Sequence, residues 1–231
     1  MRRQRRRPRI LITAGPTHEP LDPIRFLSNH STGYLGYAIA RAAAARGYST
    51  TLITGPTALE LPPVHRCFAV VTAREMLTAL RREFPRCDWL FMTAAVADFR
   101  PAQPRRSKLK KVRLPARFRL TLVRNPDLLA QVTRAKGHRL VVGWALETGR
   151  LAAAGREKLR AKRLDLLVAN RAARDGTPFG PRPVRTLLMD RTGRAVALPS
   201  MPKEVLAGIL LDKVEALWYG GANVNTAVQC C

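Results

Sequence analysis

The sequence has few of the residues that mark metal sites, disulfide frameworks and membrane spans. It contains only four cysteines and four histidines, and none of them stands in a CxxC, HxxxH or HExxH spacing, which argues against a structural zinc site. No run approaches the ~18 consecutive apolar residues of a membrane-spanning helix, and the apolar run from Ile10 to Ile12 is too short for a signal peptide. The sequence therefore predicts a cytoplasmic protein that enters no membrane, in which Cys67 and Cys87 are buried thiols.

Acidic and aromatic residues are also scarce. The 231-residue chain has 16 Asp and Glu against 41 Lys and Arg, a net charge of +25, and its aromatic content is 6%. A nucleic-acid-binding protein concentrates such charge on one element with interleaved aromatic residues, whereas here the arginines are spread along the chain. We therefore expect no specific nucleic-acid partner. The alternative is a nucleic-acid-binding protein, whose binding would persist at moderate salt and show a sequence preference. Weak binding through charge alone would disappear between ~50 and ~200 mM salt.

The apolar residues, 46% of the chain, are enough to bury a substantial core. Short continuous apolar runs are typical of strands buried on both faces of a parallel sheet, and they extend from Arg9 to Thr13, Ser49 to Thr54, Cys67 to Val71, Trp89 to Thr93, Leu140 to Ala145 and Asp165 to Ala169. Helical segments separate them, from Leu35 to Arg46, from Thr72 to Phe84 with a capping box of Thr72 and Glu75, and from Leu151 to Arg163. This order predicts an α/β fold with a doubly wound, Rossmann-like parallel sheet.

Three further segments complete the predicted fold. The stretch from Arg117 to Val123 alternates apolar and polar residues, which indicates a half-exposed strand, either in an inserted arm or at an interface. Two runs, Val184 to Met189 and Ala195 to Leu198, flank a turn and predict a C-terminal β-hairpin, and an amphipathic helix from Met201 to Trp218 follows it. We expect a basic N-terminal extension over residues 1–8, a single domain over residues 9–218 and a flexible tail over residues 219–231.

In an open parallel sheet, ligands bind beyond the carboxyl ends of the strands, so the polar residues that follow each apolar run are the candidate site. Ser31, Thr32 and Gly33 precede a helix, where backbone N–H groups and the helix dipole can hold a phosphate; ordinary N-capping by Ser31 or Thr32 is an equal alternative. Asp98 follows four small residues and could hold a divalent cation or the edge of a base or ribose. Its alternative role is to cap the turn or to pair with Arg100.

Lysine is rare in this chain, and most of its lysines fall in two clusters. The chain has 33 Arg but only eight Lys, and five of the eight are Lys108, Lys110, Lys111, Lys158 and Lys162. The last two stand four residues apart on one helix face, where like charges repel unless an anion lies between them. A compact ammonium binds phosphate as a point charge. The two clusters together indicate a polyphosphate site, with a solvated loop as the alternative for the first.

Two segments between these clusters could complete a nucleotide site. The run Arg124-Asn125-Pro126-Asp127 could contact a ligand or form a turn that caps the next helix through Asn125 or Asp127. Trp144 stands near a strand end, where its ring could pack on a nucleobase or simply on the core.

Six motifs in this order resemble those of the phosphopantothenate–cysteine ligases, the phosphopantothenoylcysteine synthetases of coenzyme A biosynthesis. They lie between Ile10 and Asn170 and read TAGPTHEPLDPIRFLSNHSTGYLG, AAVADFRP, KLKK, NPDLL, VGWALET and KLRAKRLDLLVAN. The resemblance implies that the carboxylate of 4′-phosphopantothenate attacks the α-phosphorus of a nucleoside triphosphate and releases pyrophosphate, after which the amine of L-cysteine displaces the nucleotide from the acyl-nucleotide. Bacterial members use CTP and eukaryotic relatives tend to use ATP, and the AVADFRP and KLKK motifs here are similar to the bacterial kind. The resemblance also implies a divalent cation, usually Mg²⁺, and a homodimer, in which the arm from Lys108 to Val123 contributes to the partner contact or covers the site.

The resemblance further implies roles by motif position. Asn29 would bind the activated carboxyl group and serve the transfer to cysteine, Lys108 would neutralise charge on the triphosphate, and Asp98 would hold the metal. The nucleotide would be bound by Met92, Thr93, Ala94, Asp98, Lys108, Arg124, Asn125, Pro126, Asp127, Trp144, Lys158 and Lys162. The acid substrate would be bound by Asn29, Ser31, Thr32, Gly33, Ala94 and Ala95.

Some features depart from the family's pattern. Tyr34 stands where Lys is common, Trp144 stands where Phe is common, and Pro181-Arg182-Pro183 replaces an acidic, Asn-containing stretch. Few residues precede the first predicted strand, so we expect no N-terminal flavin-dependent decarboxylase domain of the kind that many bacterial relatives carry. The alternative enzyme class, an oxidoreductase that uses NAD or flavin, rests on fold class alone, and the missing GxGxxG counts against it.

Overall fold

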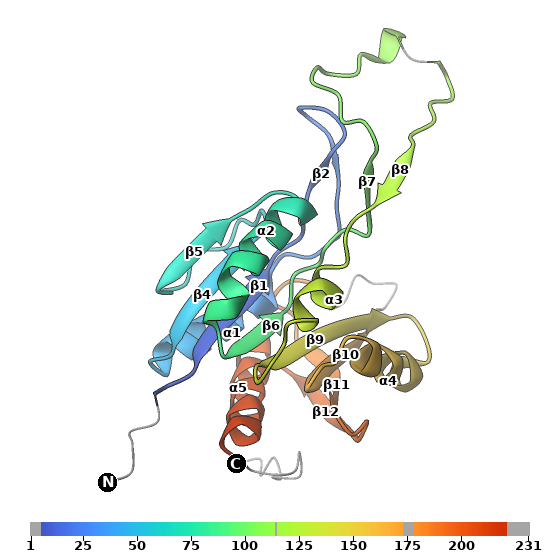
Figure 1. Cartoon of the computed structure of the whole chain (residues 1–231). Coiled ribbons are helices and arrows are strands. Elements are labelled where there is room, and N and C mark those ends of the chain that lie inside the picture. The colour runs from blue at the N-terminus through green and yellow to red at the C-terminus, as the bar shows by residue number, and fades with distance from the viewer. Residues whose placement is uncertain (1–5, 114, 173–177, 221–231) are drawn as a thin grey trace.

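Eight strands form the central sheet of the computed structural model, which describes residues 6–113, 115–172 and 178–220 (Figure 1). The strand order is β12-β11-β10-β9-β6-β1-β4-β5. The strands from β10 to β5 are parallel, and β11 and β12 add an antiparallel hairpin at one edge. Their bounds are β1 (Arg9–Ala14), β4 (Ser49–Thr54), β5 (Arg66–Ala69), β6 (Trp89–Met92), β9 (Leu140–Glu147), β10 (Leu166–Arg171), β11 (Val184–Asp190) and β12 (Ala195–Met201). The predicted α/β class and the predicted hairpin are confirmed.

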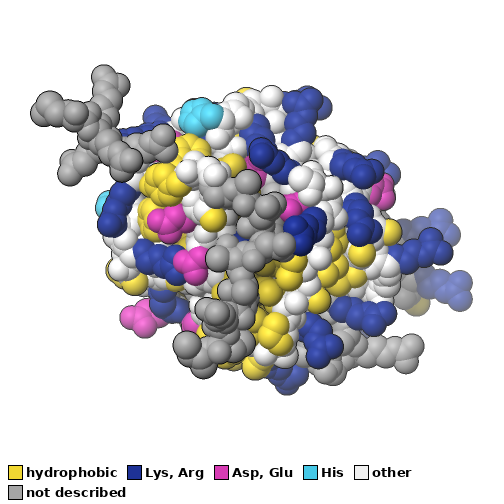
Figure 2. All heavy atoms as spheres, turned by 90° about the horizontal axis from the view of Figure 1, so that it is seen from below, with side chains coloured by type: hydrophobic (Ala, Val, Ile, Leu, Met, Phe, Trp, Pro, Cys, Tyr) yellow, Lys and Arg dark blue, Asp and Glu magenta, His cyan; other side chains and the backbone are white. Residues whose placement is uncertain are grey.

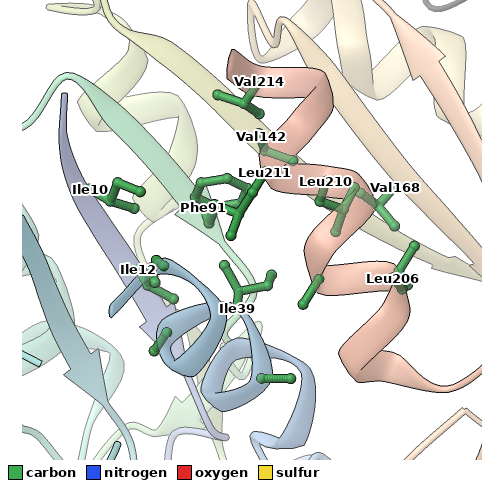
Figure 3. Packing of buried hydrophobic residues seen from close by; sticks show 14 of the residues in the cluster. Ile10, Ile12, Ile39, Phe91, Val142, Val168, Leu206, Leu210, Leu211 and Val214 are labelled. Atoms are coloured by element: carbon green, nitrogen blue, oxygen red, sulfur yellow. The ribbon is translucent and has the colours of Figure 1, made fainter. Parts of the chain in front are cut away.

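Helices cover both faces of this sheet. One face packs against α1 (Tyr34–Ala45) and α5 (Lys203–Tyr219), and the other against α2 (Ala73–Glu83), α3 (Leu128–Thr133) and α4 (Leu151–Ala161). Figure 3 shows the first core, in which strand residues such as Ile12 and Phe91 meet Ile39 of α1 and Leu210 of α5. Because side chains of β1 and β6 are buried on both faces, these strands appear in the sequence as continuous apolar runs.

The start of α2 follows the predicted capping pattern. The Thr72 hydroxyl accepts a hydrogen bond from the Glu75 N–H at 3.2 Å, and the Glu75 carboxylate accepts one from the Val71 N–H at 2.7 Å. Such a cap contributes about 1 kcal/mol to stability. Near the end of the described chain, Tyr219, which was predicted as the first residue of a flexible tail, is the last residue of α5. The rest of the tail, including Cys230 and Cys231, lies outside the described residues.

The arm, defined here as residues 99–124, projects beyond the carboxyl edge of the sheet (Figure 1). Its base is the antiparallel pair β7 (Phe99–Pro101) and β8 (Leu122–Arg124), and β2 (Glu19–Pro20) of the neighbouring β2–β3 (Phe26–Leu27) pair contacts β7. The predicted strand from Arg117 to Val123 is wrong except for its last two residues. The apolar side chains of this stretch have no surface to pack on in the described chain, because Phe118 remains 45% exposed. A β-ribbon without such packing is unstable in water.

The described residues contain two cysteines, and only one of them is fully buried as predicted. Cys87 is buried, which raises the pKa of its thiol to about 12, whereas Cys67 is only partly buried.

Seen from the end opposite the arm, Lys and Arg side chains are spread among apolar and acidic ones (Figure 2). In the described part of the chain, no helix combines the length and the apolar character needed to cross a membrane.

Candidate functional site

Two adjoining cavities open at the carboxyl edge of the parallel strands. Cavity 1 has a volume of about 560 Å³ and cavity 2 of about 480 Å³. Ala94, Val96, Asp98, Trp144 and Lys158 line both, so these residues form a shared wall. A ligand in one cavity would therefore lie beside a ligand in the other. This is the place that the topology of an open α/β sheet predicts for a binding site.

Cavity 1 lies between the loop after β6, the turn after β8 and the helix α4. The Asn125 side chain ties the two loops together, because its amide donates to the carbonyl of Ala97 at 2.9 Å and its backbone N–H donates to the carbonyl of Asp98 at 2.8 Å. The predicted residues that line cavity 1 are Met92, Ala94, Asp98, Arg124, Asn125, Pro126, Asp127, Trp144, Lys158 and Lys162.

Lys158 of α4 and Lys162, which caps the C-terminus of this helix, differ in their pairing. Lys162 forms an ion pair with Asp127, which also caps α3 by accepting from the Ala130 N–H at 2.8 Å, as the sequence predicted for one of two residues. Burial acts to raise the pKa of Asp127, but the hydrogen bonds from Lys162 and Ala130 hold it below its usual value. Lys158 takes part in no ion pair among the described residues, and burial lowers its pKa. Cavity 1 therefore holds one paired and one unpaired ammonium group.

Cavity 2 is bordered by the loop that leads into α1. Gly33 caps this helix with a φ of 80° and no side chain caps it, so the predicted alternative of capping by Ser31 or Thr32 is wrong. A Cβ at Gly33 would lie 3.0 Å from the Gly15 nitrogen, so a glycine allows the loop to approach β1. The first N–H groups of α1 lack a side-chain acceptor, which suits an anionic ligand.

Asn29 lies where the loop meets the strand ends. Its side-chain amide donates to the carbonyl of Ala95 at 3.0 Å, and it lines cavity 2 together with Ser31, Thr32, Gly33, Thr93, Ala94 and Ala95. It also lines a third, more open cavity of about 560 Å³ beside His18 and Phe26, whose rings stack at 3.8 Å. The acid-binding residues expected from the sequence are thus brought together.

Lys108 is the exception among the predicted site residues. Its side chain is exposed on the arm and lines none of the three cavities. The backbone beside it is fixed, because the Leu109 N–H donates to Asp22 at 3.1 Å and the Leu109 carbonyl accepts from Arg25 at 2.9 Å. The described chain alone does not bring this lysine to the site.

The far wall of cavity 2 was missed from the sequence. It consists of Asn170, Pro178, Phe179, Gly180, Val184 and Lys203. Asn170 is the last residue but one of the parallel strand β10 and directly follows the predicted apolar run, so the rule used for the other runs would have found it. Its amide group donates to the Arg185 carbonyl at 3.0 Å and to the Thr186 hydroxyl at 2.9 Å. Lys203 offered no such signal, since it begins a helix remote in sequence from every motif.

The described residues contain no group of three or more His, Cys, Asp or Glu side chains that could enclose a metal ion. Asp98 does offer an exposed carboxylate on the shared wall. Mg²⁺ at phosphate-transfer sites is held by one or two carboxylates together with substrate phosphates and water. The donor set therefore fits a metal that arrives with a polyphosphate rather than a metal held by the protein alone.

The doubly wound sheet, the two joined cavities at its carboxyl edge and the lysines of α4 define an α/β domain of the ligand-binding class. Comparison with known proteins identifies the family: residues 6–217 match the DNA/pantothenate metabolism flavoprotein C-terminal domain, and the chain belongs to it. The resemblance noted in the sequence is confirmed at this level.

Individual relatives agree with this assignment. The coenzyme A biosynthesis bifunctional protein CoaBC of Escherichia coli K12 is 41% identical over 207 residues, which is 89% of this chain and 51% of that protein. The chain thus spans about half the length of the curated relatives it matches. A crystal structure of a CoaBC C-terminal domain is 33% identical with a TM-score of 0.76, covering 92% of this chain and 96% of that one. A Cab2 mutant in complex with phosphopantothenate-cysteine, at 18% identity and a TM-score of 0.71 over 91% of this chain and 86% of that one, shares the fold.

Proposed function

We propose that this chain joins 4′-phosphopantothenate to L-cysteine at the expense of CTP, giving phosphopantothenoylcysteine, CMP and pyrophosphate through an acyl-cytidylate. The observation that carries the proposal is the shared wall of the two cavities. An acid and a nucleotide that lie on either side of Ala94 and Asp98 can bring a carboxylate to an α-phosphorus. Membership of a coenzyme A biosynthesis domain family supports the choice of substrates.

The residues act by positioning and by charge. Cavity 1 takes the nucleotide, with Trp144 against the base and Lys158 and Lys162 beside the phosphates. Cavity 2 takes phosphopantothenate, with its carboxyl group near Asn29 and the backbone of Ala94 and Ala95. The ammonium of Lys158 faces the charge that grows as pyrophosphate leaves, and the Asn29 amide orients the acyl group while the cysteine amine attacks its carbonyl carbon. Such preorganised charge and orientation supply most of the catalysis in reactions that need no nucleophilic side chain.

Mg²⁺ is the metal that this scheme requires. Asp98 would hold it together with phosphate oxygens of the nucleotide, and it would supply charge neutralisation at the triphosphate when bound. A homodimer is also part of the proposal. The arm supports it, because apolar side chains such as Val112, 91% exposed, and Phe118 lie on a projection that the described chain leaves uncovered.

The test is pyrophosphate release with each of the four nucleoside triphosphates in the presence of Mg²⁺, phosphopantothenate and cysteine. We expect release with CTP to exceed release with the other three and to require phosphopantothenate. Release that does not rise above a control without the acid would refute the proposal, and a preference for ATP would correct the nucleotide.

The role of Asn29 is tested by the Asn29→Ala variant. Because the side chain holds the activated carboxyl group for the second step, acyl-cytidylate formation should survive better than transfer to cysteine. The two steps are separated by measuring pyrophosphate release with and without cysteine and by trapping the intermediate. Equal loss in both steps would contradict the assignment.

A further inference from the structure

Lys203 is a buried cation that the proposed reaction does not yet use. It is the first residue of α5, only 4% of it is exposed, and it lines cavity 2. Its ammonium group donates to the carbonyl of Pro178 at 2.6 Å and to the carbonyl of Gly180. Both acceptors are neutral, so these hydrogen bonds hold the lysine in place without balancing its charge.

No carboxylate of the described residues forms an ion pair with Lys203. Glu204 beside it accepts the Tyr34 hydroxyl at 2.6 Å. A buried charge is costly unless an opposite charge or a set of hydrogen bonds compensates it. Burial accordingly lowers the pKa of Lys203 to about 8, against an opposing effect of Glu204. An ammonium group has three donors; the two carbonyls use two of them, and the ring centroid of Tyr34 lies 5.9 Å from the nitrogen.

The surroundings add positive potential. Lys203 stands in the first turn of the 17-residue helix α5, whose cap Pro202 makes no side-chain hydrogen bond to the exposed N–H groups. Lys158 lines the same cavity from the shared wall, where Asp98 is the acidic residue among the lining side chains. Cavity 2 therefore has an excess of positive charge at two separate places, one near the nucleotide and one at the far wall.

We propose that Lys203 binds a phosphate group of a substrate in cavity 2. The inference rests on the proposed function for the identity of the substrates, and it names a residue that no motif of the sequence pointed to. Two groups have this chemistry, the phosphate monoester of phosphopantothenate and the triphosphate of the nucleotide. The lining residues favour the monoester, because Lys203 lines cavity 2 and not cavity 1, whereas Lys158 lines both.

The experiment measures equilibrium binding of four probes to the full chain by calorimetry: phosphopantothenate, pantothenate, CTP with Mg²⁺, and inorganic pyrophosphate. The variants are Lys203→Gln, which keeps a donor for the loop carbonyls but loses the charge, and Lys203→Arg, which keeps the charge. Lys213→Met, on the same helix and outside the cavity linings, is the matched control. Thermal unfolding of each variant checks that it is folded.

We expect Lys203→Gln to lower the affinity for phosphopantothenate roughly 10- to 100-fold, the range for a lost charge-assisted hydrogen bond, and to leave the affinity for pantothenate unchanged. Lys203→Arg should retain most of the affinity. If the affinities for CTP and pyrophosphate fall instead, Lys203 contacts the triphosphate of the nucleotide. Equal weakening of pantothenate and phosphopantothenate, or no change in any probe, would overturn the proposal and leave Lys203 as a structural tie for the 178–180 segment.

Two further outcomes remain decisive. If the native chain binds neither phosphate-bearing substrate, the proposed function and this inference both fail; if it binds them and Lys203→Gln binds them equally, this inference alone fails. Should the Gln variant not fold, the side-chain nitrogen resonance of Lys203 in lysine-labelled native protein, assigned with Lys203→Arg, takes its place. A resonance that does not move on saturation with either substrate overturns the proposal.

Discussion

The two lysine clusters are alike in the sequence and differ in the structure. Lys158 belongs to α4, which packs on the sheet, Lys162 is the residue that caps the C-terminus of this helix, and both line cavity 1. Lys108, Lys110 and Lys111 are exposed on the arm. The arm carries ten Lys and Arg residues and no Asp or Glu, so it has no acidic residue of its own to pair with them, whereas Lys162 has Asp127.

The difference teaches that position in the fold decides what a cation can do. The α4 lysines are held in a partly buried site, where an ion pair is worth more than in water. The arm lysines are surrounded by water and screened by salt, so their attraction for a phosphate is weak until a ligand or a second chain covers them. We therefore expect the first cluster to act on binding and the second to act only in the assembled complex.

The largest effect should follow from Lys158→Met. Because Lys158 lines both cavities and has no ion-pair partner among the described residues, its loss should raise the Kd for CTP about 100-fold, at the upper end for a charged hydrogen bond in a partly buried site. Calorimetric titration measures this. Arg160→Met, on the same helix but outside the cavity linings, should change it little, and equal effects of the two variants would mean that α4 acts through overall charge.

The arm is tested by Lys108→Gln against Lys111→Gln. Lys108 adjoins Leu109, whose backbone is fixed by Asp22 and Arg25, so its charge has a defined place. We expect turnover to fall roughly 10-fold for Lys108→Gln, the size of one lost charge contact, and less for Lys111→Gln, with little change in the Kd for CTP. Equal loss in both variants would indicate that the arm provides diffuse charge.

Mixing variants shows where the arm acts. If Lys108 serves the cavity of a second copy, an equimolar mixture of Lys108→Gln and Lys158→Met chains forms hybrid dimers with one intact site. Activity of the mixture should then exceed the mean of the two variants after exchange of subunits. An activity equal to that mean would show that Lys108 does not serve the cavity of a second copy, and it would remove the main support for a role of the dimer in the reaction.

The same comparison explains how much of the fold could be predicted. The strands β1, β4 and β6 were found because both of their faces are buried, which leaves a continuous apolar run in the sequence. The stretch around Phe118 alternates regularly between apolar and polar residues, a pattern that also predicts a strand, yet it is not a strand. Alternation predicts a strand only where a second surface covers the apolar face, and a sequence does not say whether that surface exists.

Prediction of the site followed a similar division. Asp98, in the loop after β6, and Trp144, in the second half of β9, were found because chain order in a parallel sheet places the carboxyl ends of the strands at one edge. Lys203 and Phe179 reach cavity 2 through the packing of α5 and the hairpin against that edge, a tertiary contact without a local pattern. Lys108 was predicted from its neighbours in a motif, and its place on an exposed arm follows from the length of the insertion.

A smaller effect is expected for Lys162→Met. Because Asp127 already neutralises Lys162, removing the lysine removes less net attraction for a triphosphate and leaves Asp127 as an unpaired negative charge nearby. The Kd for CTP should rise about 3- to 10-fold, less than for a lysine without a partner. Calorimetry under the conditions used for Lys158→Met gives the ratio directly, and a loss equal to that of Lys158→Met would show that the ion pair opens when the nucleotide binds.

The smallest effect concerns Asp127→Asn, which sharpens the contrast between paired and unpaired lysines. Asn caps a helix as well as Asp does, so α3 should keep its cap and only the ion pair with Lys162 is lost. Since that pair is half exposed, its loss should cost about 0.5 kcal/mol of stability at neutral pH. Affinity for CTP should move the other way, about two- to fivefold tighter, because Lys162 is freed and a repelling carboxylate is gone.

The pH dependence of this variant separates the ion pair from any effect of shape. The folded-state pKa of Asp127 lies below its usual value, so the folded state holds on to fewer protons than the unfolded state, and the stabilisation is present above the unfolded-state pKa. It is lost as the pH falls through the lowered pKa of the folded state. Urea denaturation should therefore give a stability difference between the native chain and Asp127→Asn that is full at pH 7 and vanishes in strong acid. A difference that stays constant with pH would mean that the amide disturbs the α3 cap rather than the charge pair.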